Sequence, residues 1–302
     1  MILLLGATGL LGTQVLSRLI ENRWPVRVLS RGKVDWQSDY SERLKSQGVQ
    51  VSYAEFDELD KLEGAFRDCT AVINTIGSLS TRNRASLRTA NLEIAEIMVD
   101  MVQRCNVQRV IQLGCLGANQ NAKSEYLKLK WLADSKVKEC KAHWTILRPS
   151  YMFGEKFELL ELVEPLVRFR PCLPVFGSGL NLIQPVWVED VADALLLSLY
   201  DKTTVEKTYE LAGPETFSMV EFLEMLRGET GLSQATVNLP SMASAYASSI
   251  INKALPGRLF HPDLVELITA DSVSERNDLK DKFGINASSL SASLERLSRV
   301  YQ

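Results

Sequence analysis

The chain has 302 residues, of which 46% are hydrophobic and 24% are charged, as is usual for a globular protein with a large core. Its formal net charge of −3 offers no basic surplus for nucleic acid, so we expect no nucleic-acid partner. Its five cysteines and two histidines lack metal-ligand spacing, which predicts no metal site and reduced thiols, as in the cytoplasm or another reducing compartment.

The first twenty residues combine an apolar strand, three glycines and a helix. Ile2–Leu5 is a continuous apolar run, as expected for a strand buried on both faces. Gly6, Gly9 and Gly12 follow, and apolar residues recur at helical spacing over residues 11–20. In a dinucleotide site the first glycine permits a tight turn, the second lets the backbone approach a pyrophosphate, and the third lets the helix pack on the strand. The alternative is an ordinary strand-to-helix turn.

Further apolar runs, separated by helical patterns, predict the remaining strands of an α/β fold. These runs are Val26–Leu29, Val49–Phe56, Ala71–Ile76, Val110–Leu113, Trp144–Leu147 and Thr208–Leu211. Their alternation with helices predicts a doubly wound parallel Rossmann sheet with a smaller C-terminal cap domain. We assign residues 1–155 and 180–213 to the dinucleotide-binding domain, and residues 156–179 and 214–302 to the cap.

The end of the second strand is where the adenosine ribose of a dinucleotide lies in this fold. Here the chain has Ser30 and Arg31, with Lys33 close behind, rather than the acid typical of an NAD site. A guanidinium suits a 2′-phosphate by charge and by paired hydrogen bonds, so the sequence favours NADP(H) over NAD(H). The alternative is a solvated arginine paired with Asp35.

Tyr126 and Lys130 lie four residues apart in the helix predicted after the fifth strand. This spacing places both side chains on one helix face, one turn apart. Such a pair occurs often by chance, but after the fifth strand of a chain with this glycine pattern it indicates a candidate catalytic site.

Several motifs carry a family resemblance. Gly-Ala-Thr-Gly-Leu-Leu-Gly at 6–12, Leu-Arg-Pro-Ser-Tyr-Met-Phe-Gly at 147–154 and Gln-Pro-Val-Trp-Val-Glu-Asp-Val-Ala at 184–192 resemble the short-chain dehydrogenase/reductase superfamily. Among its extended and atypical branches, they look most like the atypical branch that contains the NADPH-binding accessory subunit of respiratory complex I and its bacterial relatives. The resemblance implies dinucleotide binding and suggests a membrane-associated protein complex as a partner.

The resemblance also implies roles for particular residues. The cofactor-binding residues that it implies are Gly6, Thr8, Gly9, Leu10, Leu11, Gly12, Ser30, Arg31, Asp57, Thr75, Gly77, Lys130 and Pro149. Asp57 would lie beside the adenine amino group, and the backbone at Gly77 would pass close to the cofactor. Tyr126 would be the proton donor or acceptor, while Lys130 would lower its pKa and hold the nicotinamide ribose. Asn91 would open a helix, with N-terminal capping as the structural alternative.

One position departs from the family pattern, because Gly114 stands where a catalytic serine normally steadies the substrate carbonyl. Losing such a donor typically costs roughly a hundredfold or more in rate. Ser124 would be a substitute if its loop folds inward, and a serine at position 114 is expected to raise any activity if the loop tolerates it.

Two function classes therefore remain. Gly114 favours a protein that holds NADP(H) in an assembly, structural or sensing role, with weak or unknown turnover. Tyr126 and Lys130 favour an active NADPH-dependent oxidoreductase or isomerase, acting on a small carbonyl or sugar-nucleotide-like substrate. The sequence leans towards the first class.

The sequence predicts no transmembrane segment. Cys172–Val188 and Gly231–Asn252 are long and uncharged but are interrupted by Pro, Gly, Ser or Asn. Apolar residues recur at helical spacing from Met242 to Leu255, which predicts a helix that ends before Pro256. Packing within the cap is the favoured role of this helix. Attachment to a membrane surface or to a membrane-embedded partner is the alternative, which would make the protein peripheral to a membrane.

Overall fold

The computed structural model describes residues 1–31, 37–79, 84–154, 172–230, 235–239 and 266–300. The helix predicted over residues 242–255 therefore lies outside the described residues, as does Lys33. Within the described ranges, no helix has both the length and the apolar character needed to cross a membrane.

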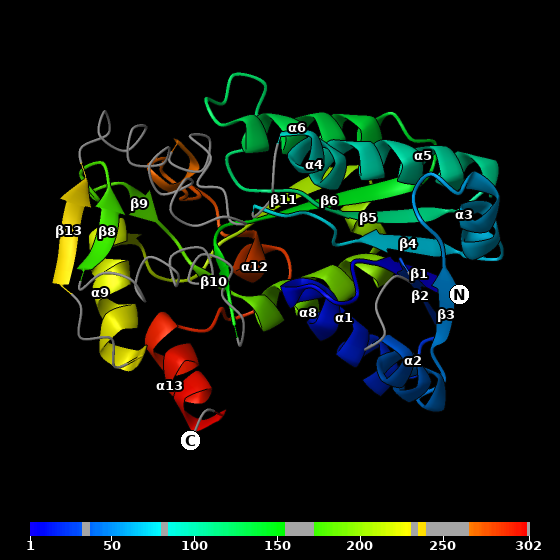
Figure 1. Ribbon diagram of the computed structural model, residues 1–302, viewed down its shortest axis with the longest axis horizontal. Helices are drawn as coiled ribbons and strands as arrows, with labels where there is room; N and C mark the ends of the chain where they lie inside the picture. The colour runs from blue at the N-terminus through cyan, green and yellow to red at the C-terminus, as the bar shows by residue number, and fades with distance from the viewer. Residues whose placement is uncertain (32–36, 80–83, 155–171, 231–234, 240–265, 301–302) are drawn as a thin grey trace.

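Seven parallel strands form the main sheet (Figure 1). In spatial order they are β11 (Lys207–Leu211), β6 (His143–Pro149), β5 (Arg109–Leu113), β4 (Ala71–Asn74), β1 (Ile2–Leu5), β2 (Val26–Ser30) and β3 (Gln50–Tyr53). The predicted doubly wound parallel sheet is confirmed. The strand order changes direction between β1 and β4, and ligands of open parallel sheets bind at the carboxyl ends of the strands beside such a point.

The strand ends follow from local hydrogen bonding and burial. All four residues of β1 are buried, as are all four of β4, which explains their unbroken apolar runs. The strand β4 ends two residues before the predicted Ile76, where the Asn74 Oδ1 accepts a hydrogen bond from the Ile76 N–H (3.0 Å) and turns the chain. The strand β3 forms the sheet edge and also ends early, at Tyr53 rather than Phe56.

Helices cover both faces of the sheet (Figure 1). The helices α1 (Leu10–Glu21), α2 (Gln37–Ser46) and α8 (Val188–Tyr200) cover one face, where α1 packs against α8. The helices α3 (Leu59–Phe66), α4 (Arg84–Arg88), α5 (Ile94–Arg104) and α6 (Glu125–Lys138) lie on the other face, where α5 packs against α3 and α6. Each layer buries an apolar stripe on the sheet, as the helical periodicities predict.

A smaller unit lies beyond the carboxyl ends of the strands, on the left in Figure 1. It contains three strand pairs, β7 (Met152–Phe153) with β10 (Val186–Trp187), β8 (Cys172–Phe176) with β13 (Ala235–Leu239), and β9 (Leu182–Ile183) with β12 (Phe217–Ser218). The helices α9 (Met219–Thr230) and α13 (Leu290–Val300) pack together in this unit. Its core is separate from those of the sheet and centres on Phe153, Trp187 and Phe222.

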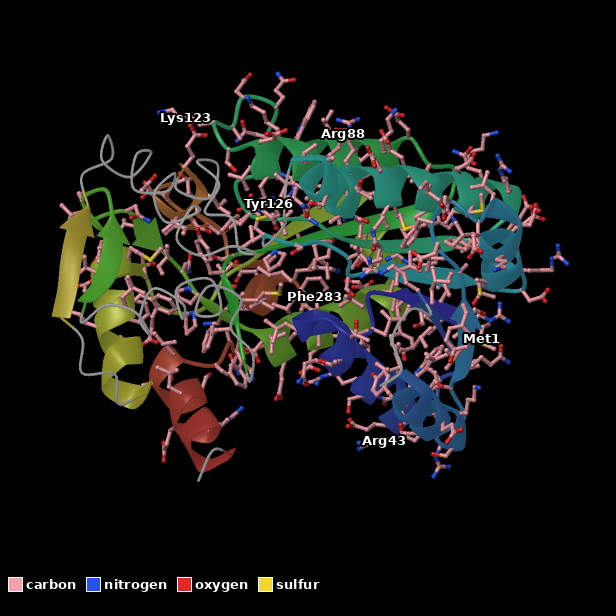
Figure 2. All side chains as sticks on the ribbon, viewed as in Figure 1. Met1, Arg43, Arg88, Lys123, Tyr126 and Phe283 are labelled. Carbon is pink, nitrogen blue, oxygen red and sulfur yellow. The ribbon has the colours of Figure 1, made fainter. Side chains whose placement is uncertain are left out.

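The C-terminal segment returns to the sheet before it reaches α13. The short helix α12 (Asp278–Asp281) buries Leu279 in the same core as α1 and α8. An Asp278 carboxylate oxygen accepts a hydrogen bond from the Glu210 N–H of β11 (2.7 Å). The Phe283 ring stacks edge-on against Tyr209 with centroids 5.2 Å apart, in the middle of the molecule (Figure 2). Residues around α12 thus pack on the dinucleotide-binding domain, although the sequence assigned them to the cap. The other domain boundaries stay a prediction.

Candidate functional site

Two of the three glycines are required by the turn itself. Gly6 has a φ of +85°, a left-handed conformation that favours glycine. A Cβ atom on Gly12 would lie 1.9 Å from the Gly6 carbonyl oxygen, so only glycine lets α1 approach the end of β1 this closely. The Thr75 hydroxyl donates to the Leu5 carbonyl (2.8 Å) and fixes the turn from the neighbouring strand. The predicted structural roles of Gly6 and Gly12 are therefore confirmed.

At position 9 the turn itself does not require a glycine. Its φ of −77° suits any residue, and a Cβ atom there would meet only the Gly6 carbonyl oxygen, at an ordinary contact distance of 3.4 Å. Gly9 stands at the N-cap of the twelve-residue helix α1, where no side chain caps the backbone N–H groups. An uncapped helix N-terminus offers hydrogen-bond donors and a positive dipole end to an anion. The structure therefore leaves Gly9 available for the approach of a phosphate.

A cavity of about 290 Å³ opens between this turn and the end of β2. Gly6, Thr8, Gly9, Ser30, Arg31, Thr75 and Gly77 line it, together with Tyr40, Ser41 and Phe56, which the sequence did not single out. None of its described lining residues is an aspartate or a glutamate. Asp57 is exposed and is not among the lining residues, because the chain places Phe56 at the wall instead.

A second cavity of about 150 Å³ extends from the first toward the cap. Gly9, Thr75 and Gly77 line both, so the two cavities form one cleft across the point where the strand order reverses. The predicted residues Leu10, Leu11, Tyr126, Lys130 and Pro149 line this second cavity. The structure thus brings together every predicted site residue except Asp57, which is exposed, and Gly12, which packs beneath the turn.

Tyr126 and Lys130 enter the cleft from α6. Figure 2 shows Tyr126 on the inner side of the helix layer, whereas Lys123 and Arg88 lie at its outer surface. Lys130 is 1% exposed, and its Nζ donates to the Leu113 carbonyl oxygen (2.7 Å) at the end of β5. The helical spacing that suggested the pair is therefore confirmed, and both side chains are available to one ligand.

The Cys115 thiol lies beside Tyr126 and shares a hydrogen bond with its hydroxyl group. Burial, the largest influence, raises the pKa of Cys115 to about 11, although the charge of Lys130 and the bond to Tyr126 oppose the rise. The thiol is protonated at neutral pH and is a poor nucleophile. The thiol therefore contacts the hydroxyl group that a reductase would offer to a substrate.

Asn91 neither opens a helix nor caps one. It lies within a π-helical turn, η1 (Thr89–Glu93), between α4 and α5. Its amide accepts a hydrogen bond from the Ser78 N–H (3.2 Å) and donates one to the Ser78 carbonyl (2.9 Å). A Cβ on Gly77 would lie 3.2 Å from the Asn91 Oδ1 and 3.3 Å from the Lys130 Nζ. The π turn thus aims Asn91 at the loop after β4 and holds that loop at the cleft.

An ion pair fills the place of the serine side chain that Gly114 lacks. A Cβ on Gly114 would lie 2.8 Å from the Arg148 Cγ and 3.0 Å from the Asp134 Oδ2. The Arg148 Nε donates to this same Asp134 oxygen at 2.8 Å. The expected gain in activity from a serine at position 114 depended on space for its side chain, and a Cβ atom there is too close to these groups for the serine to fit unless they move. Ser124 is no substitute either, because it is the buried N-cap of α6 and accepts from the Leu127 N–H.

Asp134 is the main site residue that sequence reasoning missed. It is fully buried, and burial raises the pKa of its carboxyl group while Arg148 and Lys130 oppose that rise. Its position could have been predicted from the spacing. Tyr126, Lys130 and Asp134 follow one another at intervals of four residues and therefore share one face of α6. The sequence could not reveal that Arg148, on β6, completes the pair.

The described residues contain no group of three or more His, Cys, Asp or Glu side chains that could hold a metal ion. Residues 6–166, just over half of the chain, match the family model whose description is NAD(P)H-binding. The chain belongs to this NAD(P)H-binding family. The match begins at the first glycine of the turn and extends past Tyr126, Lys130 and Arg148.

Named relatives share most of the length of this NAD(P)H-binding chain. It is 32% identical over 287 residues to the mitochondrial NADH dehydrogenase [ubiquinone] 1 alpha subcomplex subunit 9 of Arabidopsis thaliana, covering 91% of this chain and 71% of that protein. It is 29% identical over 273 residues to the mitochondrial NADH-ubiquinone oxidoreductase 40 kDa subunit of Neurospora crassa, covering 89% and 70%. A photosystem II assembly factor of Cyanophora paradoxa is 20% identical over 251 residues, covering 79% and 71%.

Solved structures show the same fold. A UDP-glucose 4-epimerase of Thermotoga maritima superposes with a TM-score of 0.74 at 17% identity, covering 99% of this chain and 98% of that one. An NADPH-dependent quinone oxidoreductase of Escherichia coli, solved with NADPH, gives 0.72 at 19% identity over the full length of both. These neighbours support the fold alone. The family match and the relatives confirm the resemblance to the atypical short-chain dehydrogenase/reductases, and the solved structures agree with it in fold.

Proposed function

We propose that this chain retains NADP(H) as a bound cofactor within a membrane-associated protein complex, in a structural, assembly or sensing role and with little or no turnover. The observation that carries the proposal is the Asp134–Arg148 ion pair, which occupies the space beside Gly114 where a carbonyl-binding hydroxyl would project. The cleft keeps the groups that would bind a dinucleotide but lacks one that would activate a substrate.

The residues that line the cleft suit a nicotinamide dinucleotide in their chemistry. The N–H groups at the start of α1, beside Gly9, suit the pyrophosphate. Arg31 is at the wall of the larger cavity, which would hold the adenosine half, and Lys130 is in the smaller one, which would hold the nicotinamide half. When bound, such a cofactor supplies a hydride donor or acceptor. Lys130 would orient its ribose, and the apolar walls of the smaller cavity would limit access of water to the ring.

The relatives support the assembly part of the proposal. One is named as a subunit of a mitochondrial NADH dehydrogenase, a second as a subunit of a mitochondrial NADH-ubiquinone oxidoreductase, and a third as a photosystem II assembly factor. We place the protein in the cytoplasm or another reducing compartment, at the periphery of a membrane. Purification of the untagged protein from its native membranes tests this role, because NADPH and the partner subunits should be recovered with it through size exclusion. Recovery of a monomer without nucleotide would contradict the proposal.

Arg31 is expected to set the preference for NADP(H) over NAD(H). Losing one charge-assisted phosphate contact costs about 1.5–3 kcal/mol, so Arg31→Ala should weaken NADPH binding by roughly 10- to 150-fold. NADH binding should change little, since NADH has no 2′-phosphate. Titration of both nucleotides into parent and variant, followed by nicotinamide fluorescence, measures the two affinities. Equal affinities for NADPH and NADH in the parent would contradict the 2′-phosphate assignment.

The alternative function, an active oxidoreductase, is favoured by one observation, the presence of Tyr126 and Lys130 in the same cavity. Under the proposed function, Tyr126→Phe leaves NADPH affinity within about twofold of the parent, because only a hydroxyl bonded to Cys115 is lost. Parent and variant should also show the same negligible NADPH oxidation across a panel of carbonyl substrates. A parent rate that disappears in Tyr126→Phe would instead establish the enzyme and identify Tyr126 as its proton donor.

A further inference from the structure

Two aromatic side chains line the larger cavity, and they come from opposite faces of the sheet. Tyr40 lies on α2 and packs against the apolar core that the sheet shares with α1 and α8. Phe56 follows β3 and packs against the core on the other face, which includes residues of α3 and α5. Both side chains are half-buried, so each has one part in a core and another part facing the cavity. A ligand in this cavity therefore meets an aromatic ring from each of the two layers.

A hydrogen-bonded turn determines that Phe56, and not Asp57, faces the cavity. The Glu58 N–H donates to the Glu55 carbonyl oxygen (3.1 Å), and the Glu55 N–H donates to the Glu58 Oε2 (2.9 Å). Phe56 and Asp57 are the two central residues of this turn, and Glu58 is also the N-cap of α3. The turn leaves Asp57 exposed while Phe56 lines the cavity. Exchanging the two side chains would require both hydrogen bonds to break.

The order of the strands places Phe56 at the base end of a bound dinucleotide. The strand β2 lies between β1 and β3 in the sheet. Gly9 follows β1, Arg31 follows β2 and Phe56 follows β3, and all three line the larger cavity. A dinucleotide with its pyrophosphate at Gly9 and its 2′-phosphate at Arg31 therefore extends its purine base toward Phe56.

We propose that the purine base is held by its two flat faces, between Tyr40 and Phe56, and that Asp57 does not read its 6-amino group. The inference rests on the proposed function, which places the adenosine half of the cofactor in this cavity. Stacking on an aromatic ring depends on the π-face of a base and tolerates changes at its edge. Adenine and hypoxanthine have similar faces and differ at position 6. The protein would thus bind dinucleotides that carry either base.

The test is fluorescence titration of the full chain with NADPH and with the reduced hypoxanthine analogue, in which an oxo group replaces the 6-amino group. The two affinities should agree within about threefold, because the stacked faces are retained. Asp57→Asn should leave both affinities at the parental values. A side chain that reads the amino group through a charge-assisted hydrogen bond would instead favour NADPH by about 10-fold or more. Such a preference in the parent, or its loss in Asp57→Asn, would overturn the inference while leaving dinucleotide binding intact.

Phe56→Ala and Tyr40→Ala test the two stacking surfaces separately. Each should weaken the binding of both nucleotides by about 10-fold and leave the ratio of the two affinities unchanged. Tyr53→Ala is the matched control, because Tyr53 is an aromatic residue of β3 that is 43% exposed and does not line the cavity. It should bind both nucleotides as the parent does.

A thermal melt establishes which of these variants are folded, and either aromatic substitution is sufficient for the test if the other one fails to fold. A folded Phe56→Ala or Tyr40→Ala protein with parental affinity for NADPH would overturn the stacking arrangement. A parent that binds neither nucleotide would overturn the proposed function itself.

Discussion

Replacing Gly9 with valine is expected to abolish dinucleotide binding while leaving the protein folded. The Gly9 backbone has an ordinary φ of −77°, and a Cβ atom added there would meet only the Gly6 carbonyl oxygen, at 3.4 Å. The added side chain therefore projects into the cleft, where a pyrophosphate would approach the N-terminus of α1. Losing that approach should weaken NADPH binding by at least about 100-fold, which is a loss of about 2.8 kcal/mol. Fluorescence titration and a thermal melt measure the two effects.

Gly12→Ala is the matched control for Gly9→Val. It adds one methyl group in the same turn, but this Cβ would lie 1.9 Å from the Gly6 carbonyl oxygen, a backbone atom. The helix α1 would have to move away from β1, so the variant should lose stability. A Gly9→Val protein that binds NADPH with parental affinity would show that the three glycines form only a structural turn.

The sheet was predictable because its central strands are buried on both faces. Such burial requires a continuous apolar run, which is visible in a single sequence at residues 2–5 and 71–74. The glycine turn was predictable for a related reason, since a left-handed Gly6 and a close-packed Gly12 each have a local steric cause. Tyr126 and Lys130 share a helix, so their spacing alone placed them on one face.

The features that escaped prediction depend on contacts between distant segments. Asp134 becomes a site residue only because Arg148 lies beside it in the folded chain. The helix start predicted at Asn91 is wrong, because a π turn within a longer helix has no distinct sequence pattern. The return of α12 to β11 depends on the buried Leu279 and on the Asp278 carboxylate, neither of which carries a local signal. The predicted place of Asp57 beside the adenine came from the family resemblance alone. In the structure Phe56, and not Asp57, lines the larger cavity.

Gly114→Ser is expected to destabilise the protein rather than to restore a catalytic hydroxyl. Its Cβ would lie 2.8 Å from the Arg148 Cγ, which is near the backbone and cannot move as freely as the end of the side chain. Displacing Arg148 also threatens its bond to Asp134, and a buried carboxylate without its partner is costly. The combined overpacking and lost pairing should cost about 3 kcal/mol of unfolding free energy.

Urea denaturation of parent and variant measures this cost, and Gly64→Ser is the matched control. Gly64 lies exposed in α3, where a Cβ would meet nothing within 4 Å, so the same substitution should change stability by less than about 1 kcal/mol. The expected order of stability is therefore Gly64→Ser close to the parent, with Gly114→Ser well below both. The prediction would be contradicted by a Gly114→Ser protein that has parental stability and reduces carbonyl substrates. Such a result would mean that the Asp134–Arg148 ion pair is easily displaced. It would also mean that the missing serine hydroxyl alone accounts for the lack of turnover.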